Sequence, residues 1–237
     1  MTINNEPHTV RSFDAELRQL DEKIRMLAFL GREQLSSAVK ALVDSDVPAA
    51  DSIVLKDGVV DRIENEVEAE CIRMLALRQP YADDLRLVFS AIRAAAELER
   101  IGDYAKNIAK RVQSMAGSHL PPAAQSIVHL ASLADDTLRM AADAFAGRDA
   151  GLAKRAWDGD RDLDEAYTAF FRETLTYMIE NPAHITAGTH LLFIAKNIER
   201  IGDHATNLAE LASYLAVGKI PEGERPKADS SPKISGV

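Results

Sequence analysis

The stretch ELERIGDYAKNIAK at residues 97–110 has a second copy, NIERIGDHATNLAE, at residues 197–210. Eight of the fourteen aligned positions are identical, whereas ordinary residue frequencies would give about one identity by chance. The two copies are offset by 100 residues. The chain therefore contains two copies of one structural unit, which we place at residues 12–116 and 121–216.

The rest of the chain also has a helical period. Apolar residues of the first segment fall in steps of four or three, at Phe13, Leu17, Leu20, Ile24 and Leu27. No run alternates apolar and polar residues over the length of a strand. The pattern predicts an all-α protein of two tandem three-helix bundles, related by a pseudo-two-fold internal repeat.

Prolines and glycines divide the chain into the expected elements. Six helices are expected, at residues 12–43, 48–77, 81–115, between the loop GSHLPP and Gly147, at 149–179 with Asp149 as a possible cap, and at 184–216. A flexible leader is expected at residues 1–11. The Pro- and Ser-rich residues 217–237 are expected to form a disordered tail.

The composition limits the classes of partner. The 237 residues include 28 Lys and Arg against 37 Asp and Glu, a net charge of −9, so nucleic acid is not expected to bind. Cys71 is the only cysteine, which fits a reducing, cytoplasmic compartment. Charges interrupt each apolar stretch before it could span a bilayer, so we expect contact with a membrane only through partner proteins.

Acidic residues spaced four apart recur in both units. In the first unit they are Asp57, Asp61, Glu99 and Asp103, and in the second they are Asp160, Asp164, Glu199 and Asp203. Proline junctions at residues 79–80 and 181–182 are expected to form the tips of antiparallel helix hairpins. Residues equidistant from a tip lie side by side.

This hairpin geometry pairs the acids. In the first unit Asp57 should face Asp103, and Asp61 should face Glu99. In the second unit Asp160 should face Asp203, and Asp164 should face Glu199. Each unit would then hold four carboxylates at one height, about 30 Å from its tip at 1.5 Å per residue.

Four neighbouring carboxylates repel one another unless a cation is present. Hard cations prefer oxygen ligands, so the sequence predicts one metal site in each unit, for iron, manganese, magnesium, calcium or zinc. The sequence has no Glu-x-x-His motif and no Cys/His cluster, which disfavours a ferritin-type di-iron centre and a structural zinc site. The alternative is a solvated acidic face with Arg100 and Arg200 as counterions.

Two glycines also recur inside the repeated motifs. A glycine in a helix interior costs about 1 kcal/mol relative to alanine. Gly102 and Gly202 carry that cost at the same place in both units. A close approach of another helix, a metal or a partner would explain it, and an inherited harmless glycine is the alternative.

The sequence resembles the PhoU family of phosphate-transport regulatory proteins. The resemblance runs from about Phe13 to Val217 and is carried by RMLALRQPYADDLRLVFSAIRAAAELERIGDYAKNIAKR and LLFIAKNIERIGDHATNLAE. It implies two tandem three-helix bundles and surface metal clusters held by E(D)xxxD motifs. Those motifs match the Glu99/Asp103 and Glu199/Asp203 pairs.

The resemblance also implies a function. A member of this family would restrain phosphate uptake and phosphate-starvation (Pho regulon) signalling, between the ATPase subunit of a phosphate ABC transporter and a sensor histidine kinase. It would be a homodimer and not an enzyme. The alternatives are a carboxylate-bridged metalloenzyme on the same acidic sites and a purely structural helical spacer.

One departure separates the two units. The acidic stripe of the second helix continues to Glu64 and Glu68 in the first unit, whereas Tyr167 and Phe171 occupy the matching positions of the second unit. The two sites are therefore expected to hold different numbers of ions.

Overall fold

The computed structural model describes residues 11–56, 58–117 and 124–221. The elements are α1 (Arg11–Val43), α2 (Val47–Lys56), α3 (Gly58–Arg78), α4 (Asp83–Ser114), α5 (Ala124–Gly147), α6 (Ala150–Asp158), α7 (Asp160–Glu180), the 3-10 turn η1 (Pro182–His184) and α8 (Ile185–Val217). The described residues contain no strand, which confirms the all-α prediction. Most of the predicted leader and tail lies outside the described residues.

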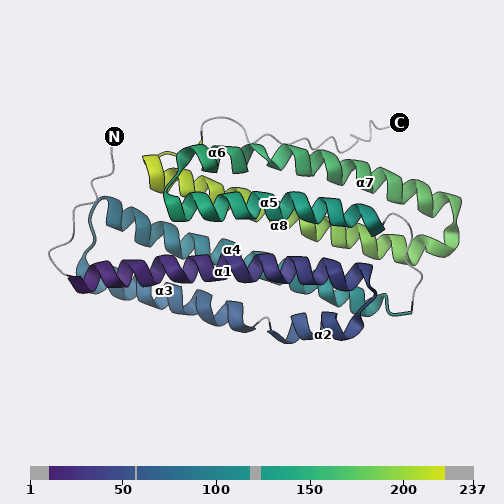
Figure 1. The fold of residues 1–237 in the computed structure, drawn as a ribbon, viewed down its shortest axis with the longest axis horizontal. Coiled ribbons are helices and arrows are strands. Elements are labelled where there is room, and N and C mark those ends of the chain that lie inside the picture. Colours follow the sequence, from purple (N-terminus) through teal and green to yellow (C-terminus); the bar gives the residue numbers. More distant parts are fainter. Residues whose placement is uncertain (1–10, 57, 118–123, 222–237) are drawn as a thin grey trace, which may run out of the picture.

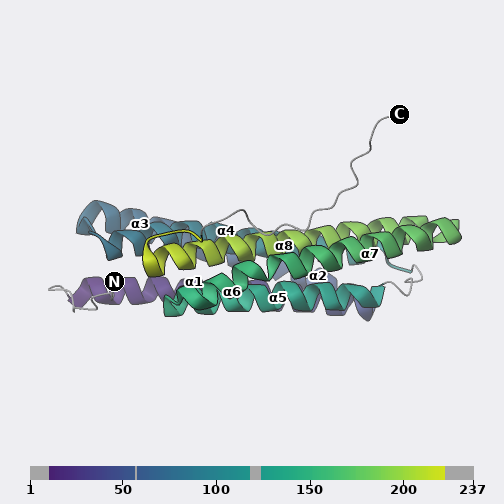
Figure 2. The same cartoon turned by 90° about the horizontal axis from the view of Figure 1, so that it is seen from above.

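Four long helices form the centre of the molecule. Helices α1, α4, α5 and α8 pack against one another, with α2 and α3 flanking α1 and α4, and α6 and α7 flanking α5 and α8 (Figure 1). Seen from above, α3, α4 and α8 lie in one layer, while α1 and α5 lie in a second (Figure 2). The two three-helix bundles thus share one core.

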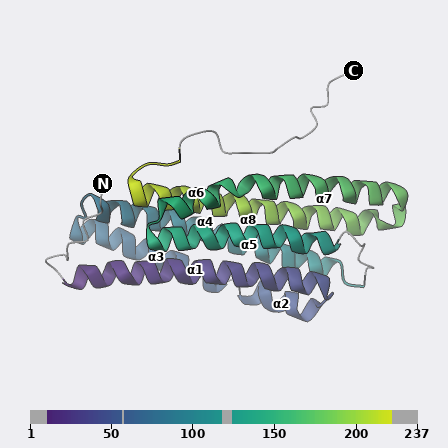
Figure 3. The ribbon, with the colours of Figure 1, turned by 45° about the horizontal axis from the view of Figure 1, so that its top comes forward.

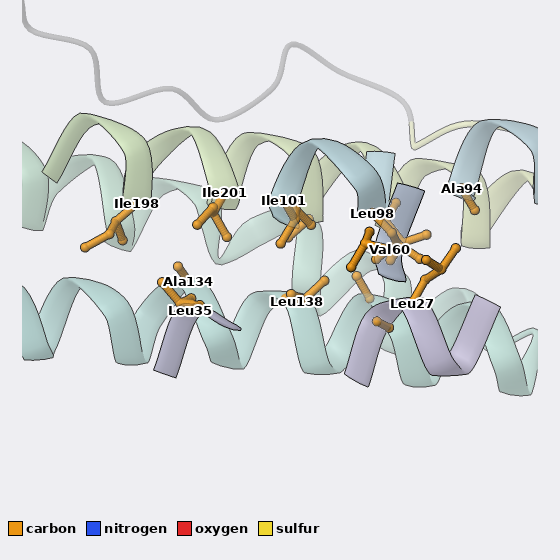
Figure 4. Close-up of a cluster of buried hydrophobic side chains, with 14 of the residues drawn as sticks. Leu27, Leu35, Val60, Ala94, Leu98, Ile101, Ala134, Leu138, Ile198 and Ile201 are labelled. Atoms are coloured by element: carbon orange, nitrogen blue, oxygen red, sulfur yellow. The ribbon is translucent and has the colours of Figure 1, made fainter. Parts of the chain in front are cut away.

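Branched and small apolar side chains fill this core. Figure 4 shows Leu27 and Leu35 of α1, Leu98 and Ile101 of α4, Ala134 and Leu138 of α5, and Ile198 and Ile201 of α8, together with Val60 of α3. The leucines and isoleucines among them are at most 1% exposed. Small alanines let the helices approach closely, and the larger side chains fill the space between them.

Two helices expected to be continuous are each divided. The segment expected at residues 149–179 ends as α6 at Asp158 and begins again as α7 at Asp160. The intervening Gly159 lies against α5, and an added Cβ would be 3.2 Å from Thr137 Oγ1. The segment expected at 48–77 is described as two helices, α2 up to Lys56 and α3 from Gly58, and residue 57 between them lies outside the described residues. The poor helix propensity of glycine accounts for the interruption at Gly159.

The hairpin tips lie at opposite ends of the molecule (Figures 1 and 3). Helices α3 and α4 meet at one end, and α7 and α8 meet at the other through η1, where Asn181 Oδ1 accepts a hydrogen bond from the Ala183 N–H. At the start of α6, Asp149 Oδ1 accepts hydrogen bonds from the N–H groups of Gly151 and Leu152, as the sequence predicted. Within the described residues, no helix is both long and apolar enough to span a membrane.

Candidate metal sites

The acids of the first unit gather where α3 packs along α4. Glu99 and Asp103 lie one turn apart on α4 and are only 24% and 32% exposed. Asp61 and Glu64 of α3 act electrostatically on Glu99 across the helix pair. Asp61 is therefore near enough to Glu99 for its charge to act on it, whereas Asp57 lies outside the described residues.

Burial and like charge make this cluster unfavourable without a cation. Burial raises the pKa of Glu99, and the carboxylates of Asp103, Asp61 and Glu64 raise it further against the opposing effect of Arg100. Burial, followed by the charges of Glu68 and Asp61, also raises the pKa of Glu64. A raised carboxyl pKa means that the protein disfavours the charged form here.

Two cations partly offset the negative charge. Lys106 Nζ lies 2.6 Å from Asp103 Oδ1, and Arg100 Nε lies 3.7 Å from Glu99 Oε2. Arg100 is the counterion that the sequence predicted. Lys106 was not predicted, although a spacing of three residues places it on the same helix face as Asp103. A metal ion at Asp103 would compete with this lysine.

The second unit is arranged differently. Asp160, expected on the surface beside Asp203, is 3% exposed. Its Oδ1 accepts a hydrogen bond from Thr206 Oγ1 at 3.2 Å. Asp160 is the first residue of α7 and contacts Thr206 of α8, so the prediction of a surface ligand is wrong for this residue. Asp164, one turn later, is half-buried.

Lysine also pairs with the acidic motif of α8. Lys196 Nζ lies 2.8 Å from Glu199 Oε2, and Glu199 is 13% exposed. Lys196 also lies over the ring of Tyr167, 5.4 Å from its centroid. Although burial lowers the pKa of Lys196, the pKa is raised overall by Glu199, Tyr167 and Asp203. The second unit therefore has fewer acids at this place, and a lysine pairs with its motif as one does in the first unit.

The two repeated glycines determine how closely the flanking helices α3 and α7 pack against α4 and α8. A Cβ added at Gly202 would be 2.1 Å from Leu163 Cδ2. At Gly102 it would be 3.4 Å from Val60 Cγ1 and 3.0 Å from Gln34 Oε1. Val60 and Leu163 are each 1% exposed and directly precede the acids of their helices. Each glycine thus leaves room for an apolar side chain of the flanking helix. The packing of that side chain fixes where along α4 or α8 the neighbouring carboxylates lie.

The donor set of the first unit fits a hard cation better than that of the second. Its ligand atoms are carboxylate oxygens, and the charged forms of Glu99 and Glu64 are disfavoured without a cation, which Mg²⁺, Mn²⁺ or iron would relieve. Among the described residues, no three His, Cys, Asp or Glu side chains form a ready-made ligand group. Binding would therefore require side-chain rotation and displacement of Lys106.

A polar cluster that the sequence did not predict lies between the two units, where α4 packs against α8. His204 Nδ1 lies 2.6 Å from Glu97 Oε2, and Asn207 Nδ2 donates to the same oxygen at 3.0 Å. Burial raises the pKa of Glu97, but the hydrogen bonds from His204 and Asn207 outweigh it, so the pKa is lowered overall. The repeat differs at this position, with Asn197 where the first unit has Glu97, so the repeat pattern did not indicate it.

Glu99→Gln should stabilise the protein in a chelating buffer, by about 0.5 kcal/mol, because the substitution removes like-charge repulsion. The pKa of Glu99 is raised in the folded state, so its repulsion with the neighbouring carboxylates develops as pH rises through that pKa. The gain should appear near neutral pH and disappear below pH 4.5, where Glu99 is protonated. Thermal unfolding at both pH values tests this, with the exposed Glu33→Gln of α1 as control. With bound metal the sign should reverse.

The fold and the sites together define a class: an all-helical protein of two repeated bundles, with acidic helix pairs suited to hard cations. The profile of the PhoU domain matches residues 24–112 and 127–212. The chain belongs to the PhoU family.

Relatives of known name share nearly the whole chain. A phosphate-specific transport system accessory protein PhoU homolog of Rhizobium meliloti (strain 1021) is 45% identical over 231 residues, which cover 97% of this chain and 98% of the relative. A homolog of the same name from Caulobacter vibrioides (strain NA1000 / CB15N) is 39% identical, with 94% and 97% covered.

Solved structures of the family have the same fold. The crystal structure of PhoU from Pseudomonas aeruginosa superposes with a TM-score of 0.84 at 36% identity, over 87% of this chain and all of that one. The phosphate transport system regulatory protein PhoU from Streptococcus pneumoniae gives a TM-score of 0.82 at 30% identity, over 89% and 100%. These similarities extend over both repeats.

Proposed function

We propose that this protein is a non-enzymatic negative regulator of phosphate uptake and of phosphate-starvation signalling. The observation that carries the proposal is the acidic motif of the family, present at Glu99/Asp103 and again at Glu199/Asp203 on the two central helices α4 and α8. The names of the relatives, accessory and regulatory proteins of phosphate transport, support the same role.

The proposed role is that of an adaptor in the cytoplasm. It would dock on the ATPase subunit of a phosphate ABC transporter and on a sensor histidine kinase, as a homodimer that meets the membrane only through these partners. The free, buried thiol of Cys71 suits a reducing compartment. Long helices with exposed polar faces offer rigid docking surfaces to both partners.

Metal would act on the surface rather than on a substrate. In the first unit Asp61, Glu64, Glu99 and Asp103 would hold it, with Asp57 added from the sequence. In the second unit the donors would be Asp164, Glu199 and Asp203. A bound cation supplies positive charge that relieves the repulsion within each cluster, and so stabilises the packing of the flanking helix on α4 or α8.

A deletion experiment tests the regulatory role. In a strain that lacks the gene, a phosphate-starvation promoter should be active even in phosphate-rich medium, and the wild-type gene should restore repression. A double variant, Glu99→Gln with Asp103→Asn, should restore it incompletely at the same protein level. Unchanged repression in the deletion strain would contradict the proposed function. Metal-dependent turnover lost on Asp103→Asn and Asp203→Asn would instead favour the metalloenzyme alternative.

A further inference from the structure

Helices α4 and α8 present matching stripes of side chains along their contact. The stripe on α4 consists of Arg93, Arg100, Tyr104 and Arg111, and the stripe on α8, at the same offset of 100 residues, consists of Phe193, Arg200, His204 and Leu211. Both stripes advance in steps of seven, four and seven residues, which keeps their members on one face of each helix. These eight residues are called the seam.

The contacts of the seam show that the stripes run antiparallel. The Arg111 guanidinium lies 4.4 Å from the centroid of the Phe193 ring, and that of Arg200 lies 5.6 Å from the centroid of Tyr104. At the other end, Arg93 and Leu211 line one hollow. Each of four successive levels therefore carries one arginine, over a length of about 27 Å at 1.5 Å per residue.

The arginines of the seam are available to a partner. Within the described part of the chain, no carboxylate lies within 4.0 Å of a side-chain nitrogen of Arg93, Arg111 or Arg200. Arg100 approaches Glu99 at 3.7 Å and is still 62% exposed. This is unusual for a chain with a net charge of −9, in which acids outnumber bases.

The carboxylates that border the seam are already engaged inside the protein. Glu97 accepts hydrogen bonds from Asn207 and contacts His204, and Glu210 Oε1 accepts one from Trp157 Nε1 at 3.2 Å. Arg93 still acts electrostatically on Glu97 and helps to lower its pKa. Arg111 and Arg200 also rest on aromatic rings, which fixes each guanidinium while its N–H groups stay free to donate.

A hollow at one end of the seam is suited to an apolar side chain. Its volume is about 190 Å³, and it is lined by Phe89, Arg93, Glu210, Leu211, Tyr214 and Ile220. Phe89 is 50% exposed and Ile220 is 52% exposed, so much apolar surface here faces solvent. Phe193, at the opposite end of the seam, is 49% exposed. Exposed apolar groups beside arginines are typical of interaction surfaces.

We propose that the seam is the docking surface for an acidic helical segment of a partner protein, whose carboxylates pair with the four arginines while an apolar residue enters the hollow. Charge complementarity selects this occupant. The chain's own residues 222–237 contain three acidic and three basic residues, so charge does not favour them. The surface requires no metal, and the proposal thus goes beyond the proposed function.

The test uses the full-length protein and two labelled helical peptides of about 18 residues, the length that spans the seam. One carries glutamates on one face with a single leucine near its end, and the other carries lysines at the same positions. Fluorescence anisotropy measures binding to the wild type, to Arg100→Gln/Arg200→Gln and to the control Arg18→Gln/Arg155→Gln. The control removes two exposed arginines of α1 and α6, and thermal unfolding checks that each variant is folded.

The acidic peptide should bind, more weakly at higher salt, and the seam variant should weaken it about tenfold while the control changes it less than about twofold. Phe89→Ala should weaken it as well. Equal weakening in both double variants, or no binding of the acidic peptide, would overturn the proposal. So would tighter binding after removal of residues 222–237, which would identify the tail as occupant. A dimer that dissociates in the seam variant would identify a second copy instead.

Discussion

Leu163→Ala should destabilise the protein by about 2–5 kcal/mol, the range for truncating a buried leucine. Leu163 is 1% exposed and fills the space that Gly202 leaves on α8. The loss corresponds to a fall in melting temperature of roughly 4–20 °C in a chain of this length. Thermal or denaturant unfolding followed by circular dichroism measures it.

A double variant separates packing from other causes. Gly202→Ala alone should also destabilise, because its Cβ would be 2.1 Å from Leu163 Cδ2. Combined with Leu163→Ala, that methyl group enters vacated space, so the two losses should not add. Leu175→Ala on the same helix, 37% exposed in the wild type, is the control and should have a much smaller effect. Simple additivity would show that Gly202 does not accommodate Leu163.

Glu97→Ala should destabilise the protein by about 1–3 kcal/mol, because it leaves His204 and Asn207 without their acceptor at the contact between the two repeats. The folded-state pKa of Glu97 is lowered, so its contribution is present above its ordinary value of 4.5 and is lost as pH falls through the folded value. The difference from the wild type should therefore narrow in acid. Unfolding between pH 3 and 7 measures it.

Asn197→Ala is the matched control for this prediction. Asn197 occupies the position in the second repeat that Glu97 occupies in the first, and within the described residues its side chain has no hydrogen bond. It should change stability by less than about 0.5 kcal/mol. An equal effect of both substitutions would mean that Glu97 contributes through helix propensity rather than through His204 and Asn207.

Local sequence patterns predicted the architecture well, because helix formation depends on residues that are close together in the sequence. The period of apolar residues predicted the helices, and the repeat of the motif around Gly102 and Gly202 predicted the internal symmetry. The pairing of Asp61 with Glu99 followed from the hairpin tip alone, and the electrostatic interaction between the two residues agrees with it. The interruption between α6 and α7 falls at Gly159, whose poor helix propensity is the sequence signal for it.

Local sequence patterns could not predict contacts between segments that are distant in the sequence. Asp160 belongs to a regular DxxxD spacing, yet it is buried and hydrogen-bonded to Thr206 of α8. Glu97 and His204 meet only because α4 and α8 pack antiparallel, a relation that neither repeat specifies by itself. Side-chain packing between helices, rather than the period within them, decides such positions.

The metal content of the protein purified without added metal tests the central claim most directly. The wild type would be compared with Glu99→Gln/Asp103→Asn and Glu199→Gln/Asp203→Asn by elemental analysis. The account predicts stoichiometric iron, manganese, magnesium or zinc in the wild type, lost from one unit in each variant, with the larger loss in the first unit. A wild type that binds no metal, even after incubation with Mg²⁺, Mn²⁺ or iron, would contradict it and leave the acids as plain surface charge.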